Sequence, residues 1–273
     1  EKPQAVICTG GFVAGPVAIS AALLRIPLFF HESNSYPGLV TRKMAKWINT
    51  IFISFENTRK YLTCSKLVNY GIPLRQAAID DRQKPFDICS LGLKNDKPTL
   101  LVSGGSQGSV AINTVVNQAI SDILSLGYQI IWQTGKMSYA RFSAQHKGKE
   151  GIYIFAFSPD LPKMFSRCCL AITRAGALTI AELEANHLPA ILIPLPTAAE
   201  NHQYYNALAQ QEKGVAILLE QSKLTPFSLV ENIKKITENL EIYRNKLAAL
   251  PPNEAAQKIV DYILNYLNNK EEK

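Results

Sequence analysis

The chain has 273 residues, of which 47% are hydrophobic and 19% are charged, a composition typical of globular proteins and unlike that of disordered chains. This length suits about two domains of roughly 100 to 200 residues each. The net charge of +7 comes from scattered lysines and arginines, without the basic block or groove-reading module of a nucleic-acid-binding protein. We therefore expect no nucleic-acid partner, while solubility and attraction to an anionic membrane surface stay open as meanings of the charge.

The cysteine pattern and the chain ends give further expectations. There is no Cys-x-x-Cys pair and no zinc-like spacing with a histidine, which favours a reduced cytosolic protein without a metal. No signal peptide and no apolar run of about 18 residues is present, so we expect a soluble or peripheral protein. Because residue 1 is glutamate and the first strand already opens onto a glycine turn, we expect a chain truncated at its N-terminus. The polar tail, residues 268–273, is expected to fray.

Short β-rich apolar runs alternate with stretches of helical period along the chain, which predicts parallel sheets covered by helices on both faces. In the first part we expect strands at residues 5–9, 27–30, 51–54 and 66–68 and helices at 16–24 and 39–47. The second part is predicted to hold strands at residues 99–102, 129–132, 152–155, 170–172, 190–193 and 216–218, and terminal helices at 226–240, 242–250 and 254–267. Residues 76–97 are polar and without a clear period, which is typical of a linker between domains.

Two glycine-rich segments, residues 8–16 and 103–108, each lie between an apolar strand and a helical stretch. Glycine lets the backbone approach a ligand closely, and the N-terminus of the following helix presents unpaired N–H groups to a phosphate. Neither segment matches the dinucleotide fingerprint or the Gly-Lys-Ser/Thr loop of nucleotide triphosphatases. Each loop alone can equally be a tight turn without a ligand.

A third segment, Thr173 to Glu182 (TRAGALTIAE), ends a predicted buried strand and opens a helix. Thr179 and the backbone amides near Gly176 could meet a phosphate. Glu182 lies about one and a half turns into the helix, where a carboxylate suits the paired hydroxyls of a ribose. The alternative is an acidic residue that the helix dipole favours.

Two further polar segments follow predicted strands, at the ends where open α/β sheets bind ligands. In the loop at residues 194–206, His202 could carry a proton, although a loop histidine without a visible partner more often makes a hydrogen bond. In residues 31–38 (HESNSYPG), the adjacent His31 and Glu32 are expected to point to opposite faces and not to act as an acid–base pair. Asn34 is the better contact, because its amide both donates and accepts.

Taken in this order, and with the motifs GGSQG, TRAGALTIAE and AENHQYYNA, these segments resemble the MurG family of bacterial transferases in glycosyltransferase family 28. The resemblance covers nearly the whole chain and implies the α/β GT-B fold, in which two Rossmann-like domains with parallel sheets face each other across a cleft. It implies the following division: residues 1–75 as the C-terminal part of a membrane-facing acceptor domain that is incomplete, 76–97 as the linker, 98–250 as the UDP-sugar-binding domain, and 251–273 as a helix and tail that pack back on the first domain.

The resemblance also implies an activity, that of an inverting N-acetylglucosaminyltransferase of peptidoglycan synthesis. N-acetylglucosamine would pass from UDP to the 4-hydroxyl of undecaprenyl-pyrophosphoryl-MurNAc-pentapeptide (lipid I) and give lipid II. No cofactor and no metal is expected, because helix N-termini can stabilise the departing UDP. The catalytic residue is unknown within this sequence, because the histidine that the family implies would lie upstream of residue 1.

The implied partners are UDP-N-acetylglucosamine, lipid I, an anionic membrane surface and other enzymes of cell-wall synthesis. The implied location is the cytoplasmic face of the bacterial inner membrane, with the protein bound peripherally. A plausible contact surface is formed by the apolar helix at residues 17–24 with Arg25, Arg42, Lys43, Lys46 and Trp47. A packed helix with a solvated basic face is an equally good interpretation.

By position, the resemblance assigns contacts with UDP-N-acetylglucosamine to Asn34, Arg75, Ser106, Ala177, Leu178, Thr179, Glu182 and Gln203. Ser106 would bind the diphosphate, residues 177–179 the diphosphate and sugar, Glu182 the ribose and Gln203 the sugar hydroxyls. Weaker candidates are Gly105, Gln107, Ser158, Leu161, Gly176 and His202. Ser158 and Leu161 fall at the uracil, where Ser158 departs from the aliphatic residue that the family implies.

Two alternatives remain from the sequence. Another GT-B enzyme could use a different glycolipid acceptor such as a diacylglycerol, although HESNSYPG and AENHQ occurring together disfavour it. A non-catalytic nucleotide-sugar-binding subunit, completed by a partner chain, is the alternative from another class.

Overall fold

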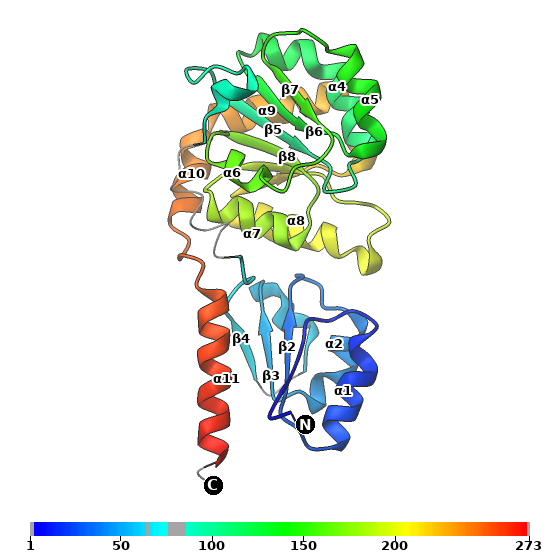
Figure 1. The fold of residues 1–273 in the computed structure, drawn as a ribbon, viewed down its shortest axis with the longest axis vertical. Helices are drawn as coiled ribbons and strands as arrows, with labels where there is room; N and C mark the ends of the chain where they lie inside the picture. Colours follow the sequence, from blue (N-terminus) through cyan, green and yellow to red (C-terminus); the bar gives the residue numbers. More distant parts are fainter. Residues whose placement is uncertain (1–2, 64–65, 76–85, 272–273) are drawn as a thin grey trace.

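The computed structural model describes residues 3–63, 66–75 and 86–271, and two parallel sheets dominate it (Figure 1). The first sheet has the strand order β1-β2-β3-β4, and the second has the order β10-β9-β8-β5-β6-β7. We call the first sheet with its helices, residues 3–75 and 255–271, the first unit, and residues 86–250 the second unit. In both sheets the described strands pair in parallel, as the alternating sequence pattern predicts.

The first unit contains β1 (Val6–Cys8), α1 (Ala14–Leu23), β2 (Leu28–Glu32), α2 (Leu39–Met44), η1 (Ala45–Trp47), β3 (Thr50–Ile53), η2 (Glu56–Tyr61) and β4 (Leu67–Asn69). Its strands alternate between two apolar faces. Leu28 and Phe30 of β2 pack with α1 and α2, whereas Phe29 between them packs on the other face. A strand buried on both faces reads as a continuous apolar run, which is why residues 27–30 are recognisable in the sequence.

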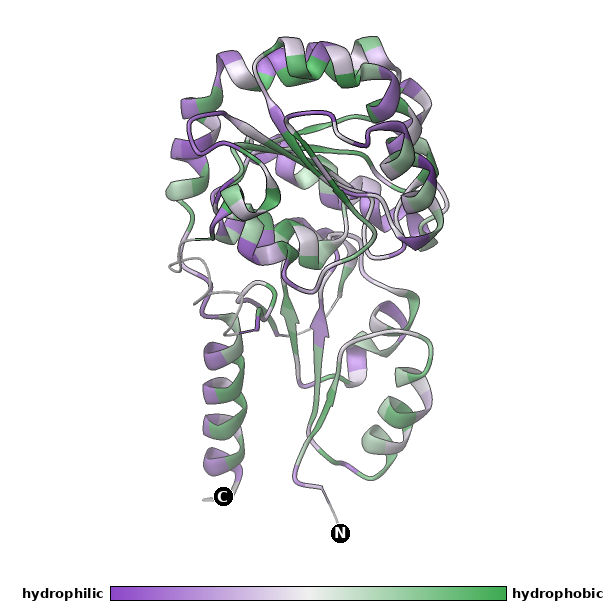
Figure 2. Cartoon of the chain, turned by 45° about the horizontal axis from the view of Figure 1, so that its top comes forward, coloured by the Kyte–Doolittle hydropathy of each residue, from purple (hydrophilic) through white to green (hydrophobic). Residues whose placement is uncertain are grey.

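The last helix, α11 (Ala255–Glu271), crosses back to the first unit and covers the second face of its sheet (Figure 1). Ile259 and Ile263 pack against Phe29 and Phe52. Figure 2 shows hydrophobic residues along the side of α11 that faces the sheet and hydrophilic residues along the opposite side. The prediction of a frayed tail is wrong for residues 268–271, which continue the helix. Packing of Leu267 anchors the preceding turn, and the positive charge of Lys270 in the last turn interacts favourably with the negative end of the helix dipole.

The second unit begins with η4 (Ile88–Leu91) and then follows a strand-helix alternation. Its remaining elements are β5 (Thr99–Ser103), α4 (Val110–Ser125), β6 (Gln129–Gln133), α5 (Lys136–Gln145), β7 (Ile152–Phe155), α6 (Leu161–Phe165), β8 (Leu170–Thr173), α7 (Ala177–Ala185), β9 (Ala190–Leu192), η5 (Ala199–Asn201), α8 (His202–Lys213), β10 (Ala216–Leu218), η6 (Gln221–Lys223), α9 (Pro226–Glu238) and α10 (Leu240–Ala248). Two apolar clusters, one on each face, bury the central strands.

The second half of the predicted linker belongs structurally to this unit. Ile88 and Leu93 are buried in its core, and Phe86 packs against the same cluster. The segment has no recognisable period because only isolated side chains are anchored in the core. Its one regular element is a short 3₁₀ helix, Ile88–Leu91. The first half, residues 76–85, lies outside the described residues.

Candidate functional site

The loop after β5 carries the candidates Gly105, Ser106 and Gln107 into helix α4. Ser106 and Gln107 are exposed at its tip, and Ser109 caps the helix by accepting a hydrogen bond from the Ile112 amide at 3.3 Å. The loop is pressed against the turn after β6, since a Cβ on Gly108 would lie 2.1 Å from the Thr134 carbonyl oxygen. Glycine here therefore serves close backbone packing, while the exposed tip is the part available to a ligand.

Gln133, at the end of β6, links this loop to the turn with Ser158, one of the residues predicted to contact the uracil. Its Nε2 donates to Ser103 Oγ and to the Gly105 carbonyl, both at 3.2 Å, and its Oε1 accepts from the Ser158 amide at 3.2 Å. The hydroxyl of Ser158 accepts a hydrogen bond from the Asp160 amide at 3.1 Å within the same exposed turn. Leu161 starts α6 and is half-buried. The structure thus brings the turn at residues 158–161 beside the loop at residues 104–108.

Helix α7 begins directly after Gly176, which offers no side chain to cap it. The first-turn residues are Ala177, which is buried, Leu178, which is exposed, and Thr179, which is half-buried. The amides of this turn and the positive end of the helix dipole are therefore available to an anion. This geometry is what the motif predicts.

Glu182 lies on α7 one turn beyond Leu178. Burial raises the pKa of its carboxyl group, and the Arg75 guanidinium partly opposes this rise. Arg75 belongs to the first unit and is exposed, so the two units bring these two candidates near each other. Within the described residues the Glu182 carboxylate accepts no hydrogen bond, which leaves it open to hydroxyl donors.

Arg174 is a residue of this site that the sequence did not single out. One of its terminal nitrogens donates to the carbonyls of Ile193 and Pro194 at 3.2 and 3.0 Å, and the other donates to Ser109 Oγ and Gln221 Oε1 at 2.7 Å. Burial lowers its pKa, but arginine stays protonated in proteins. A positive charge, held by neutral acceptors, therefore lies at the N-terminus of α4. Its position two residues before Gly176 in the third motif was the signal available.

The loop between β9 and α8 has a strained turn. Glu200 and Asn201 both have left-handed backbones, with φ of 54° and 53°. His202 Nδ1 lies 2.7 Å from the Ala199 carbonyl. From the sequence, His202 could be a proton carrier or a hydrogen-bonding residue, and this contact is of the second kind. Gln203 uses its Oε1 to accept from the Leu195 amide at 3.0 Å, so its Nε2 is the atom directed elsewhere.

The segment after β2 folds around Glu32. Its carboxylate accepts from the amides of Asn34 and Gly38 at 3.1 and 3.0 Å and from Thr41 Oγ1 at 2.8 Å. His31 instead lies 2.9 Å from the Gly71 carbonyl through Nε2, and burial lowers its pKa. The two side chains have separate partners, in agreement with the prediction that they are no acid–base pair.

Asn34 reaches the second unit through Asn206 of α8, which the sequence analysis quoted but did not assign. Asn206 Nδ2 donates to Asn34 Oδ1 at 3.1 Å, and its Oδ1 accepts from the Ser35 amide at 2.8 Å. The structure therefore places the Asn34 candidate beside the loops of the second sheet. No sequence signal identifies Asn206, because its partners Asn34 and Ser35 lie more than 170 positions away along the chain.

Arg42, predicted as part of a basic membrane surface, has a different place. It forms an ion pair with Glu200 at 2.7 Å, and its guanidinium lies 4.9 Å from the centre of the Tyr36 ring. An acidic residue of the second unit therefore partners Arg42, and of the basic residues that the sequence offered for a contact surface on α2 and η1, Lys43 and Lys46 are the exposed ones.

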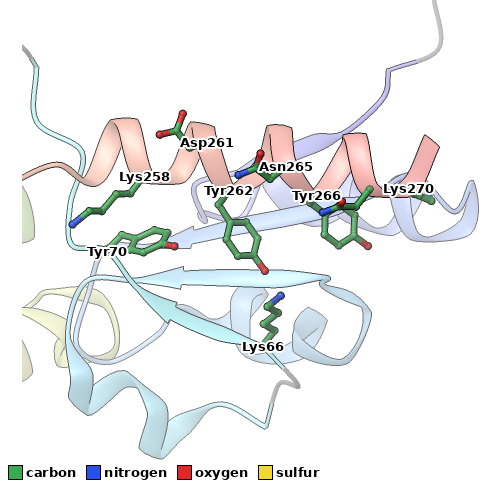
Figure 3. A pocket seen from close by; sticks show the side chains of 9 residues that line it. Lys66, Tyr70, Lys258, Asp261, Tyr262, Asn265, Tyr266 and Lys270 are labelled. Carbon is green, nitrogen blue, oxygen red and sulfur yellow. The ribbon is translucent and has the colours of Figure 1, made fainter. Parts of the chain in front are cut away.

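Two larger hollows lie away from these residues. A groove of about 620 Å³ runs between β4 and α11, where Lys66, Tyr70 and Tyr262 line it (Figure 3). A second cavity of about 600 Å³ lies between the units, beside Ile72 and Ile180. None of the predicted ligand contacts lines the groove or the cavity. The candidate site consists instead of the loops at the carboxyl ends of β5, β7, β8 and β9, together with Asn34 and Arg75 of the first unit.

Two family models match the sequence of this chain. The model of the glycosyltransferase family 28 C-terminal domain matches residues 99–263, and that of the family 28 N-terminal domain matches residues 1–53. The chain belongs to glycosyltransferase family 28.

Named family members show how similar the chain is to them. A UDP-N-acetylglucosamine–N-acetylmuramyl-(pentapeptide) pyrophosphoryl-undecaprenol N-acetylglucosamine transferase of Halalkalibacterium halodurans is 37% identical over 264 residues, which cover 94% of this chain and 72% of that protein. The Exiguobacterium transferase of the same name is 34% identical and covers 96% and 73%. The crystal structure of Acinetobacter baumannii MurG aligns with a TM-score of 0.78 at 29% identity, again over 96% and 73%.

More distant structures support the fold alone. The UDP-GlcNAc 2-epimerase of Neisseria meningitidis aligns with a TM-score of 0.68 at 11% identity. Together with the family 28 match, the two parallel sheets confirm the prediction of an α/β GT-B fold.

Proposed function

We propose that the protein transfers N-acetylglucosamine from UDP-N-acetylglucosamine to lipid I and forms lipid II. The observation that carries the donor half is the uncapped N-terminus of α7 followed by Glu182, whose buried carboxylate has no hydrogen-bond donor of its own among the described residues. An anion at the helix start and a diol one turn later match a ribose attached to a diphosphate. The acceptor half is supported by the relatives, since the transferases similar to this chain carry that acceptor in their names.

In this proposal the diphosphate lies between Ser106 and the first turn of α7, residues 177–179. Glu182 accepts hydrogen bonds from the ribose hydroxyls, and the turn holding Ser158 and Leu161 contacts the uracil. Asn34 and Gln203, with His202 beside it, contact the sugar, and Arg75 lies near Glu182.

The chemical step leaves negative charge on the departing UDP. The N-terminus of α4 and the positive charge of Arg174 are fixed in place before the reaction, because both are held by hydrogen bonds within the loops. Such preorganised positive groups stabilise a developing anion without reorganisation. Arg174 is therefore proposed to contribute charge as well as to fix the loops.

Membrane association is proposed on the side of α1. Phe12, Val13 and Leu23 are 87%, 83% and 79% exposed, and Trp47 is 60% exposed. The exposed lysines Lys43 and Lys46 flank this apolar surface on α2 and η1. Among the described residues no helix is long and apolar enough to cross a bilayer. An apolar surface with flanking lysines suits peripheral binding to an anionic leaflet, which we place at the cytoplasmic face.

The test is a transfer assay on the intact protein, including any segment that precedes residue 1, with UDP-N-acetylglucosamine and a lipid I analogue, beside a parallel reaction with diacylglycerol. We expect a disaccharide-lipid product from the first reaction alone. Transfer to the glycerolipid instead would establish the alternative GT-B enzyme, and donor binding without any transfer would favour a binding subunit.

A further inference from the structure

The amide of Asn206 is buried between the two units. Its side chain is 0% exposed, and every atom that can bind is engaged. Oδ1 accepts from the Ser35 amide at 2.8 Å, while Nδ2 donates to Asn34 Oδ1 at 3.1 Å and to the Ala175 carbonyl at 3.2 Å. A flipped amide would set a nitrogen against the Ser35 N–H and an oxygen against two oxygens, so these partners fix its orientation.

This one side chain contacts both sides of the candidate donor site. Ala175 lies between β8 and Gly176, directly before the first turn of α7. Asn34 and Ser35 belong to the segment after β2, in the other unit. Two other polar contacts between the units are more exposed: the Arg42–Glu200 pair is 27% and 41% exposed, and Asn57 donates to Glu212 at an exposed position. Water and salt weaken exposed contacts, whereas buried hydrogen bonds keep their strength and direction.

The contact with Asn206 decides what Asn34 can offer to a ligand. Because Asn34 Oδ1 is occupied by Asn206 Nδ2, the amide group of Asn34 presents its Nδ2, which donates to no other group among the described residues. A free amide nitrogen donates to an oxygen, such as the acetamido carbonyl or a ring hydroxyl of an amino sugar. The orientation of Asn34 thus follows from Asn206.

We propose that Asn206 is a positioning residue that turns Asn34 Nδ2 toward an oxygen of the donor sugar and ties this contact to the loop before α7. The inference rests on the proposed function, because it takes the donor to be a nucleotide sugar. Asn206 itself touches no ligand; it acts through Asn34. Its effect therefore falls on recognition of the sugar and leaves recognition of the nucleotide to Glu182 and the helix N-termini.

The first test uses Asn206→Asp, which keeps the shape and still accepts from Ser35. The new carboxylate repels Asn34 Oδ1, so Asn34 reverses its amide and presents an oxygen to the sugar. By calorimetry we expect the affinity for UDP-N-acetylglucosamine to fall about 5- to 20-fold and the affinity for UDP to change less than about twofold. Equal losses for both ligands would overturn the proposal.

A matched control removes another hydrogen bond between the units. Asn57→Ala breaks the bond to Glu212 outside the candidate site, and we expect neither affinity to change. If Asn57→Ala also weakens binding of the sugar nucleotide alone, the effect belongs to the approach of the units in general, and the specific role of Asn206 is refuted.

The second test leaves Asn206 intact, so it does not depend on whether that variant folds. Asn34→Asp keeps an oxygen to which Asn206 can donate and replaces the nitrogen assigned to the sugar by an anionic oxygen, which cannot donate. We expect unchanged thermal unfolding and UDP affinity, with the same loss for UDP-N-acetylglucosamine, and no additional loss when Asn206→Ala is combined with Asn34→Ala. Undiminished sugar-nucleotide affinity in Asn34→Asp, or fully additive losses, would overturn the proposal. Failure of the unmodified protein to bind UDP-N-acetylglucosamine would instead refute the proposed function.

Discussion

Arg174 has an unusual environment for a charged residue, because four neutral oxygens and no carboxylate hold its guanidinium. Three loops meet at this side chain: the α4 cap at Ser109, the end of β9 and the turn at Gln221. Its place in the third motif marks Arg174 as near the site, but the motif does not show what the side chain contacts, since the acceptors lie 19 to 65 positions away. A residue whose function depends on distant partners cannot be assigned from spacing alone.

Replacing Arg174 by methionine keeps the volume but removes the charge and the donors. We expect the free energy of unfolding to fall by about 2 to 4 kcal/mol, because buried acceptors lose their partners. Transfer should slow by roughly 100-fold, the size seen when one preorganised donor to a developing anion is removed. Urea unfolding and steady-state kinetics measure the two effects. Arg174→Lys, which keeps the charge, should recover part of the rate; recovery of none would show that geometry alone matters.

Glu182 should make donor binding dependent on its charge. Glu182→Gln preserves the shape of the side chain but removes the anionic acceptor, so we expect UDP-sugar affinity to weaken by about 1 to 3 kcal/mol. Calorimetry with UDP measures this loss. Unchanged affinity would remove Glu182 from the ribose.

The raised pKa of Glu182 sets the direction of the pH dependence. Its carboxyl takes up a proton at a higher pH in the folded protein than a free glutamate does, so UDP affinity should fall with decreasing pH already above the ordinary range of glutamate. The same shift means that burial of the charge costs stability above the folded pKa, and that this cost is absent below the unfolded pKa. In Glu182→Gln the pH dependence of affinity should be lost over this range; its persistence would point to another group.

At the scale of elements, prediction succeeded where packing follows the local pattern. The six strands of the second sheet and the glycine turns after them are recognisable because strands buried on both faces form short apolar runs. The helix predicted at 254–267 is present as α11, but the prediction ended it too early. The observed helix continues to Glu271, supported by the packing of Leu267 and by Lys270 in its last turn. Asn206 and Gln133 were missed because their single polar side chains follow no period.

Helix α11 offers a test of how strongly it holds the first unit. Ile263 is 6% exposed and packs against the first sheet, whereas the adjacent Leu264 is 53% exposed. We expect Ile263→Ala to lower the free energy of unfolding by about 2 to 4 kcal/mol and Leu264→Ala by about 0.5 kcal/mol or less. Equal effects in urea unfolding would contradict the packing of α11 on that face.

At the scale of the whole molecule, several strongly exposed apolar residues and the exposed Lys43 and Lys46 lie on or beside α1, α2 and η1. Changing Lys43 and Lys46 to glutamate should weaken binding to vesicles containing anionic lipid by about 1 kcal/mol or more per residue. Lys147 and Lys149, exposed in the second unit, provide a control with the same change in net charge. Vesicle sedimentation at low and high salt measures both variants; equal losses would indicate a general charge effect instead of a surface.

The chain passes between the units twice, once after Arg75 and once after Leu250, and Asn253 joins the two passages by donating to the Ile72 carbonyl at 2.9 Å. This hydrogen bond fastens the segment that leads to Arg75 to the segment that leads into α11, beside the cavity between the units. The two stretches of chain that join the units are therefore held to each other as well as to the sheets, so a substitution at either one is felt at the other.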